Sequence, residues 1–268
     1  SALEKLLNLK WNYLVIPEID DDSLTFVSAW IKEQRAKQKT FKVVLPNYQG
    51  DHEAIINFTT DNINSNLSDV LFSTAEYCAR IAGMLAGLSL TRSSTYFVFN
   101  DIVDADVPTD DAGTRIDKGE FIIIYDGENF KVGRGVNSLT TFTTNHGEDF
   151  SKIKIVEGVD LYNDDIRTTF EDFYVGKYIN DYDNKQAFVA SINAYNKTLE
   201  GDVLDKTYDN ITSIDIDAQK LYLEGKGIDT SSMSDIELAK ANTGSNVFVT
   251  GNIKFVDAME DLDMINYM

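Results

Sequence analysis

Residues 133–177 read GRGVNSLTTFTTNHGEDFSKIKIVEGVDLYNDDIRTTFEDFYVGK, and this stretch decides how the chain is organised. Residues 137–144 are rich in threonine and serine hydroxyls, which predicts a polar connection rather than core. The alternation of charged and apolar residues in Lys152–Val156 predicts a half-buried strand. Asp164 then begins a predicted helix that ends at Gly176 and has one apolar stripe at helical spacing. The stripe consists of Ile166, Phe170, Phe173 and Tyr174.

Strands and helices alternate before this stretch. Trp11–Ile16 and Phe41–Leu45 are apolar runs that each end at a proline, and the segment from Asp20 between them has the apolar stripe of a helix. Strand, helix and strand with short connections predict a parallel pair of strands. Ser73 and Glu76 have the spacing of a capping box, which predicts the start of a second helix.

The same rules predict the remaining elements. Asp126-Gly127 predicts the turn of a hairpin between Glu120–Tyr125 and Phe130–Gly135. The aspartate-rich segment Asp101–Asp117 is predicted to be an acidic loop or lid. Further strands are predicted at Ile55–Phe58, Tyr96–Phe99, Ile214–Leu223, Asn246–Val256 and Leu262–Tyr267, and further helices at residues 2–8, from Asp183 onward and at Ser234–Ala241.

The composition limits the classes of partner. The formal net charge is −20, so nucleic acid and anionic membrane surfaces would be repelled. The simplest interpretation of this acidity is solubility. Because no run approaches about 18 apolar residues, we expect no membrane insertion. Cys78 is the single cysteine and lies in an apolar helical segment, which predicts a buried thiol rather than a nucleophile.

Patterns that would indicate catalysis or ligand binding are sparse. A serine hydrolase needs a histidine that is held by a carboxylate and aimed at the serine, and the chain has only His52 and His146. The aspartates of residues 104–111 do not form a calcium loop, because Thr109 stands where that loop needs glycine. Residues 133–138 lack the third glycine of a dinucleotide-binding fingerprint. We therefore expect no enzyme activity, no cofactor and no metal.

Several segments in a fixed order resemble one known family. VNSLTTFT (136–143) followed by VDLYNDDIRTTFEDFYVGK (159–177) is similar to the tail sheath proteins of contractile bacteriophage tails and of phage-tail-like, R-type bacteriocins. The early segment WNYLVIPEIDDDSLTFVSAWIKEQR (11–35) and the ending VDAMEDLDMINYM (256–268) are similar to the same family. The resemblance extends over essentially the whole chain, and its motifs are structural rather than catalytic.

The resemblance implies an α/β fold in two domains. Residues 1–147 are expected to form a subtilisin-like three-layer α/β domain without a catalytic triad. Residues 148–268 are expected to form a smaller α+β C-terminal sheath domain that ends in a β-strand, and the change of domain is placed between Thr144 and Phe150. The chain begins with Ser1, so we expect a fragment that lacks the N-terminal arm and β-rich domain of the family and is monomeric in solution.

The resemblance also implies a function. Sheath subunits form stacked sixfold rings around a tail tube, and the sheath contracts to drive the tube through a cell envelope. The implied partners are neighbouring sheath subunits in a helical homopolymer of hexameric rings, the tail tube protein, and the baseplate and tail terminator proteins, with no direct nucleic acid contact. The implied location is the virion tail, assembled in the bacterial host cytoplasm. Two alternatives stay open: a degenerate or active subtilisin-like serine hydrolase, and an acidic binding module unrelated to tails.

The end of the chain is the first candidate assembly site. In the family, a C-terminal strand joins a small sheet that is completed by arms of neighbouring subunits, which is strand addition between chains. The alternative is an ordinary edge strand, protected from pairing by Asp261 and Asp263. The candidate residues are Asp257, Ala258, Met259, Glu260, Asp261, Leu262, Asp263, Met264, Ile265, Asn266, Tyr267 and Met268.

A cluster of basic residues is the second candidate assembly site. Five of the 24 basic residues lie within eleven positions of this acidic chain, and we expect them to face the acidic segment Asp101–Asp117 of a neighbouring subunit. The alternative is that they favour the negative end of a helix dipole. The five residues are Lys32, Arg35, Lys37, Lys39 and Lys42.

Overall fold

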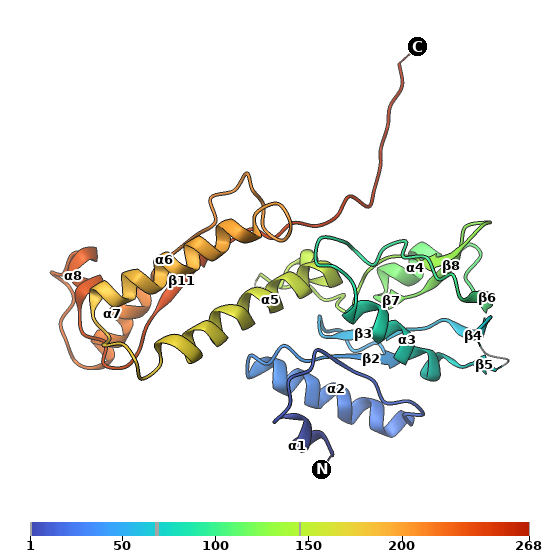
Figure 1. The fold of residues 1–268 in the computed structure, drawn as a ribbon, viewed down its shortest axis with the longest axis horizontal. Coiled ribbons are helices and arrows are strands. Elements are labelled where there is room, and N and C mark those ends of the chain that lie inside the picture. Colours follow the sequence, from blue (N-terminus) through green and yellow to red (C-terminus); the bar gives the residue numbers. More distant parts are fainter. Residues whose placement is uncertain (1, 68–69, 145, 268) are drawn as a thin grey trace. The chain divides into compact units, whose positions relative to one another are not determined.

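The computed structural model describes residues 2–67, 70–144 and 146–267, so Met268 of the candidate assembly site lies outside the described residues. The chain divides into two compact units. The first unit contains the residues up to Asp160 together with the segment from Asp257 onward, and the second is Leu161–Val256. Each unit is a mixture of helices and small sheets (Figure 1).

A parallel sheet is the centre of the first unit. Its strands are β1 (Tyr13–Leu14), β2 (Lys42–Pro46), β3 (Ile55–Phe58) and β7 (Glu120–Phe121), in the order β1-β2-β3-β7. Each neighbouring pair is parallel. The predicted parallel pairing of the two strands that flank the first long helix is therefore confirmed, as is the predicted strand at Ile55–Phe58.

Helices α2 (Asp21–Ala36) and α3 (Thr74–Ala86) cover opposite faces of this sheet (Figure 1). Successive side chains of a strand point to opposite faces, so the buried β2 and β3 separate two apolar clusters. The cluster under α2 contains Leu24, Val27, Ile31, Val43, Leu45 and Ile55. The cluster under α3 contains Tyr77, Ile81, Leu85, Val44, Ile56 and Phe58. The first unit is thus built in three layers, helix, sheet and helix.

Local signals place the start of both helices where the sequence predicts them. The Asp20 carboxylate accepts a hydrogen bond from the Ser23 backbone N–H at 2.8 Å, which caps α2. Ser73 and Glu76 form the predicted capping box at the start of α3. Cys78 on α3 is buried, as predicted, and burial raises the pKa of its thiol to about 12.

The remaining elements of the first unit lie around these layers. They are α1 (Ala2–Leu6), the antiparallel sheet β5-β4-β6 (Leu71–Phe72, Asp61–Ser65, Ile102–Asp106), α4 (Ala112–Asp117), and the hairpin β8 (Ile123–Tyr125) and β9 (Phe130–Val132), with a 3₁₀ turn at Glu148–Ser151. The predicted hairpin is confirmed. The predicted loop at Asp101–Asp117 is wrong, because β6 pairs with β4 and α4 follows. At Tyr96–Phe99 only Val98 makes a β-bridge, so the predicted strand is reduced to one residue.

The second unit consists of helices around a two-stranded antiparallel sheet. The helices are α5 (Ile153–Thr169) with a π-helical turn at Phe170–Tyr174, α6 (Tyr182–Leu199), α7 (Ile216–Gly225) and α8 (Asp235–Lys240), and the strands are β10 (Ile211–Ile214) and β11 (Val249–Asn252). The division between the units falls within α5, after Asp160. Side chains of α5 and α6 form the main core of the second unit, which includes Tyr162, Phe188 and Ile192.

Several predictions for residues after 136 are wrong. Ile153–Val156 is the beginning of α5 rather than a strand, only Lys152 of the predicted strand makes a β-bridge, with Val136, and Asp164 is inside that helix. The predicted strand Ile214–Leu223 is mostly α7, because the Asp215 carboxylate accepts a hydrogen bond from the Ala218 N–H at 2.8 Å and caps a helix there. The predicted strand Asn246–Val256 shrinks to β11.

The polar run after β9 is also partly mispredicted. Asn137 and Ser138 are fully buried. Burial is tolerated because their polar groups are hydrogen-bonded within the first unit: the Ser138 N–H donates to the Ile55 carbonyl at 2.8 Å, and the Asn137 side-chain amide donates to the Phe150 carbonyl at 2.7 Å.

Candidate functional site

The C-terminal segment from Asp257 onward contains no helix or strand in the described residues. The predicted strand Leu262–Tyr267 is therefore wrong for the isolated chain. A strand needs a partner for its backbone groups, and no described segment of this chain pairs with these residues. The apolar side chains of the segment face solvent, and the most exposed are Met259, Leu262, Met264, Ile265 and Tyr267.

Glu260 departs from this pattern, because its side chain is only 4% exposed. Its Oε1 atom accepts hydrogen bonds from Ser93 Oγ and Thr95 Oγ1, both at 2.6 Å. Its Oε2 atom pairs with Lys152 Nζ at 2.5 Å and with Arg134 Nε at 3.2 Å. Two hydroxyls and two cations thus hold one carboxylate of the C-terminal segment.

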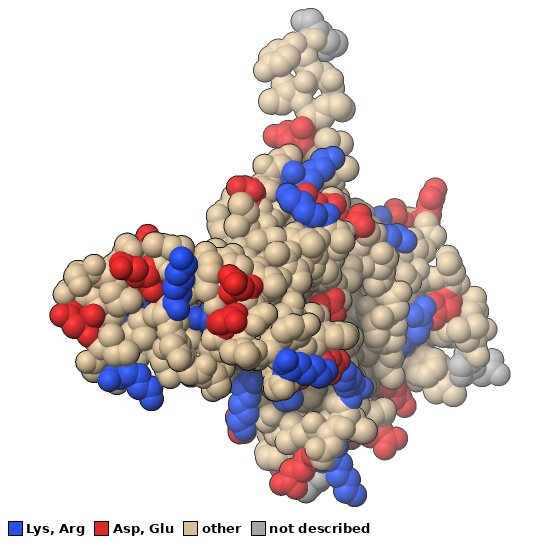
Figure 2. Space-filling view, turned by 60° about the vertical axis from the view of Figure 1, so that its left-hand side comes forward, with Lys and Arg blue, Asp and Glu red and all other residues tan. Residues whose placement is uncertain are grey.

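The acidic residues on either side of Glu260 extend these contacts. Arg134 Nη1 donates to Asp261 Oδ1 at 2.9 Å, and its second terminal nitrogen contacts the other carboxylate oxygen, so the pair is bidentate. Lys152 Nζ lies 3.6 Å from Asp257 Oδ2. In Figure 2 the end of the chain projects as a largely uncharged column, with basic and acidic side chains gathered at its base.

The contacts at the base of the segment shift the pKa values of Glu260 and Asp261. Burial alone would raise the pKa of Glu260, but hydrogen bonds from Lys152, Ser93 and Thr95 outweigh it and lower the pKa. The hydrogen bond from Arg134 lowers the pKa of Asp261 and correspondingly raises that of the guanidinium. Both carboxylates are therefore held in the charged form.

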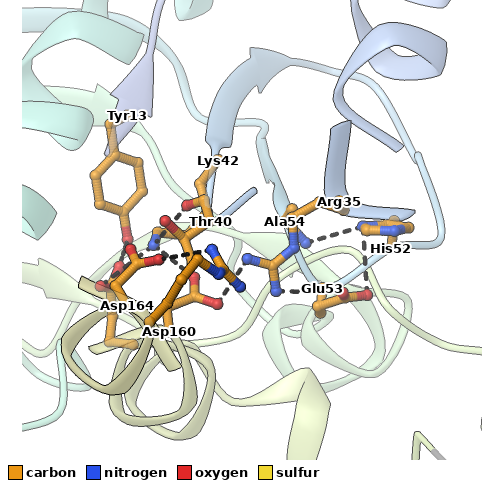
Figure 3. A network of polar contacts seen from close by, with 11 residues as sticks. Tyr13, Arg35, Thr40, Lys42, His52, Glu53, Ala54, Asp160 and Asp164 are labelled. Atoms are coloured by element: carbon orange, nitrogen blue, oxygen red, sulfur yellow. Dashed lines mark hydrogen bonds and ion pairs between the residues drawn. The ribbon is translucent and has the colours of Figure 1, made fainter. Parts of the chain in front are cut away.

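The second candidate site, the basic cluster, is divided by the structure. Arg35 and Lys42 have side chains only 12% and 3% exposed, and both pair with carboxylates of their own unit (Figure 3). Arg35 Nη1 lies 2.6 Å from Asp160 Oδ1, and Lys42 Nζ lies 2.8 Å from Asp160 Oδ2. These two residues therefore have little surface with which to meet a neighbouring subunit.

Further groups complete the network around Asp160. Arg35 also contacts Glu53 at 3.4 Å, and Lys42 contacts Glu157 at 3.4 Å. The Tyr13 hydroxyl donates to Glu157, and burial followed by the charge of Glu157 raises the pKa of Tyr13. Glu157 and Asp160 lie three residues apart on one face of α5, so the network fixes the first turns of α5 to β1, β2 and α2.

The other three basic residues stay at the surface. Lys37 and Lys39 are exposed and Lys32 is half-buried. Lys37 pairs with Glu33 one turn earlier on α2, where both side chains are 59% exposed. In the predicted acidic partner segment, Asp101 pairs with Arg80 at 3.2 Å, whereas Asp104, Asp106, Asp110, Asp111 and Asp117 are exposed.

The residues that a hydrolase would need are arranged differently from a triad. The Ser138 hydroxyl donates to the backbone carbonyl of His52 at 3.1 Å, not to its ring. The ring Nδ1 of His52 accepts the Ala54 N–H at 3.1 Å, and burial lowers the pKa of the ring. The Asp51 carboxylate accepts hydrogen bonds from the backbone N–H groups of Thr140 and Thr141, at 2.8 and 2.9 Å, and so stabilises the loop that contains these threonines. This arrangement aims no base at a serine.

The described residues offer neither a metal site nor a membrane-spanning helix. Among them, no three His, Cys, Asp or Glu side chains are grouped so as to hold a metal ion. None of the helices formed by these residues combines the length and apolar character needed to cross a membrane.

Comparisons with known proteins agree over nearly the whole length. The family model described as phage tail sheath protein central domain matches residues 1–138, and the phage tail sheath C-terminal domain model matches residues 145–268. The chain is 39% identical to a protein named tail sheath protein from Clostridium phage phiCD119, over 98% of this chain and 74% of that protein. The chain belongs to the phage tail sheath protein family, and the resemblance predicted from its sequence is confirmed.

Solved structures of sheath proteins share the fold. The sheath tail protein of Desulfitobacterium hafniense aligns with a TM-score of 0.70 and 24% identity, over 79% of this chain and 52% of that one. The helical sheath of the anti-feeding prophage in its contracted state aligns with a TM-score of 0.69 and 14% identity, over 99% of this chain and 73% of that one. The chain thus spans about half the length of the Desulfitobacterium protein.

Proposed function

We propose that the chain is a structural subunit of a contractile tail sheath that polymerises as stacked sixfold rings around a tail tube and contracts to drive the tube through a cell envelope. The observation that carries the proposal is the family match over nearly the whole chain. The proposed location is the tail of a phage or phage-like particle, assembled in the host cytoplasm. The proposed partners are other sheath subunits, the tube, the baseplate and the tail terminator.

The C-terminal segment suits a linking role. Residues Leu262–Tyr267 present apolar side chains and unpaired backbone groups to solvent, and a neighbouring copy would supply the missing strand partner. Contacts of this kind join one surface to a different surface of the next copy, so they propagate along a polymer. Backbone pairing also persists while the rest of each subunit rotates, as contraction requires.

The proposed fold of the first domain is the subtilisin-like fold without its chemistry, over residues 1–147, with residues 148–268 as the sheath C-terminal domain. A parallel sheet between two helical layers supports this proposal. The hydrogen bonds of Ser138 and His52 favour a structural role for this domain over a hydrolase.

Electron microscopy tests the proposed function. The protein is expressed with its tube partner in the full length that its gene encodes, and helical cylinders are expected. A variant that ends at Asp261 should fold normally but form no cylinders. Leu221→Ser on α7 is the matched control, because Leu221 is an exposed apolar residue outside the segment, and this variant should assemble. Equal assembly of the truncated variant would contradict the linking role, and failure of the unmodified protein to assemble with its tube would contradict the sheath function.

A further inference from the structure

A carboxylate is the most protected part of the C-terminal segment. Glutamate is rarely buried unless it is paired, whereas apolar side chains usually seek the interior. Here the apolar residues on both sides of Glu260 face solvent, and Met259 is fully exposed. The segment is therefore attached to the first unit by charged side chains, of which Glu260 is the most buried, and not by apolar packing.

The site that receives Glu260 is built from three parts of the chain that are distant in sequence. Ser93 and Thr95 come from the loop after α3, Arg134 follows β9, and Lys152 immediately precedes α5. We call these four residues the Glu260 socket. The Gly135 N–H donates to Thr95 Oγ1 at 2.9 Å, which fixes one of the hydroxyls that bind the carboxylate.

The socket also accounts for the Gly133-Arg134-Gly135 motif. A Cβ atom at Gly135 would lie 2.6 Å from Ser94 Oγ and 3.0 Å from Ser93 Oγ, so a larger residue here would displace the serine side chains of the loop. Arg134 then points to Glu260 and Asp261. The Gly133-Arg134-Gly135 motif, which does not fit a dinucleotide, therefore forms part of the site that binds the Glu260 carboxylate.

We propose that Glu260 is the anchor of the C-terminal segment: the socket holds its carboxylate, which leaves Leu262–Tyr267 free to bind a neighbouring copy. Six extended residues span about 20 Å, which sets the reach of the free part. A force exerted by a bound neighbour would be transmitted to the first unit through the Glu260 socket, at the loop after α3 and at the start of α5. Glu260 acts as a positioning residue, and this role in assembly rests on the proposed sheath function.

Backbone ¹⁵N relaxation of the single chain tests the anchor without any need for assembly. In the unmodified protein, order parameters of residues 258–261 should be near the rigid value of about 0.85, whereas residues 264–267 should fall below about 0.6. In Glu260→Ala both ranges should fall below about 0.6. Glu260→Gln keeps the acceptor for the two hydroxyls and loses the charge, so it should be intermediate. Asp263→Asn, an exposed residue of the same segment, is the matched control and should change nothing.

The outcomes separate the anchor from the proposed function. Low order at residues 258–261 in the unmodified protein, or no change in Glu260→Ala, overturns the anchor. If the order falls as expected, assembly with the tube should drop at least tenfold in Glu260→Ala while its melting temperature stays that of the Asp263→Asn control. Unchanged assembly with a released segment overturns the positioning role. An ordered anchor in a protein that never forms a sheath supports the anchor and contradicts the sheath function.

Discussion

Removal of the Asp160 charge is the most direct test of the network that fixes α5. The Asp160 carboxylate lies 2.6 Å from Arg35 and 2.8 Å from Lys42, and its side chain is 7% exposed. Breaking a buried pair by removing one partner costs about 3–5 kcal/mol, because the remaining charge stays buried without compensation. Asp160→Asn keeps an acceptor, and Glu53 and Glu157 still contact the two cations at 3.4 Å. We therefore expect a loss of about 2–4 kcal/mol, toward the lower end of that range.

The assay is urea denaturation of the purified chain followed by circular dichroism and tryptophan fluorescence. Both tryptophans lie in the first unit: Trp30 is on α2, and Trp11 stacks on Phe41 with ring centroids 4.0 Å apart. Their fluorescence thus reports the unit that contains the network. Glu33→Gln is the matched control, because it breaks an exposed pair on α2 and should cost about 0.5 kcal/mol or less. Equal losses for Asp160→Asn and Glu33→Gln would refute the reasoning, because the network would then contribute no more than a surface pair.

Three further predictions follow from other contacts. Gly135→Ala should destabilise the first unit by about 1–3 kcal/mol in the same denaturation assay, whereas Gly147→Ala, with open space around its Cβ, should be nearly neutral. Burial raises the pKa of Asp51, but hydrogen bonds from two threonines outweigh it and lower the pKa to about 2. The carboxylate therefore stabilises the fold above about pH 4 and loses that effect as the pH falls toward 2. In Asp51→Asn the melting temperature should depend less on pH over that range, and an unchanged slope would contradict this. Lys37→Glu with Lys39→Glu should alter the salt dependence of sheath assembly, and identical assembly from low to high salt would exclude the contact with an acidic surface.

The sequence predicts elements best where local signals and packing agree. The capping residues of α2 and α3 are within three residues of the N–H groups they bind, and the strands β2 and β3 are mostly apolar, with Lys42 and Asn57 as the exceptions. Each of these features is visible in a short window. The layered α/β arrangement of the first unit follows from them because a strand buried on both faces needs a helix on each side.

The prediction fails at Lys152–Val156 because a short alternating run fits both a strand and a helix. Ile153 and Val156 are buried, at a spacing of three, and Asp160 continues the same helical face toward Arg35 and Lys42. The partner of that face is α2 and β2, more than 100 positions earlier in the chain. No pattern within the segment itself could identify a buried ionic face on α5.

The Glu260 socket is similarly invisible to local reasoning. Glu260 is separated from Ser93 by 167 positions and from Lys152 by 108. The sequence does identify the last twelve residues as an assembly candidate, but only through resemblance, and it does not distinguish the attached part from the free part. The one local signal is Gly133-Arg134-Gly135, whose role depends on a loop 40 positions away.

The net charge of −20 limits how copies of this chain can hold together. Identical acidic subunits repel one another, so bringing them into a polymer costs electrostatic free energy that rises as salt is removed. Many basic side chains are already engaged within their own subunit, as Arg35, Lys42, Arg134 and Lys152 are. In the proposed sheath we therefore expect contacts between copies to draw mainly on apolar surface and backbone pairing, and residues Leu262–Tyr267 offer both. If these apolar and backbone contacts dominate, added salt should strengthen assembly. If contacts of Lys37 and Lys39 dominate instead, added salt should weaken assembly.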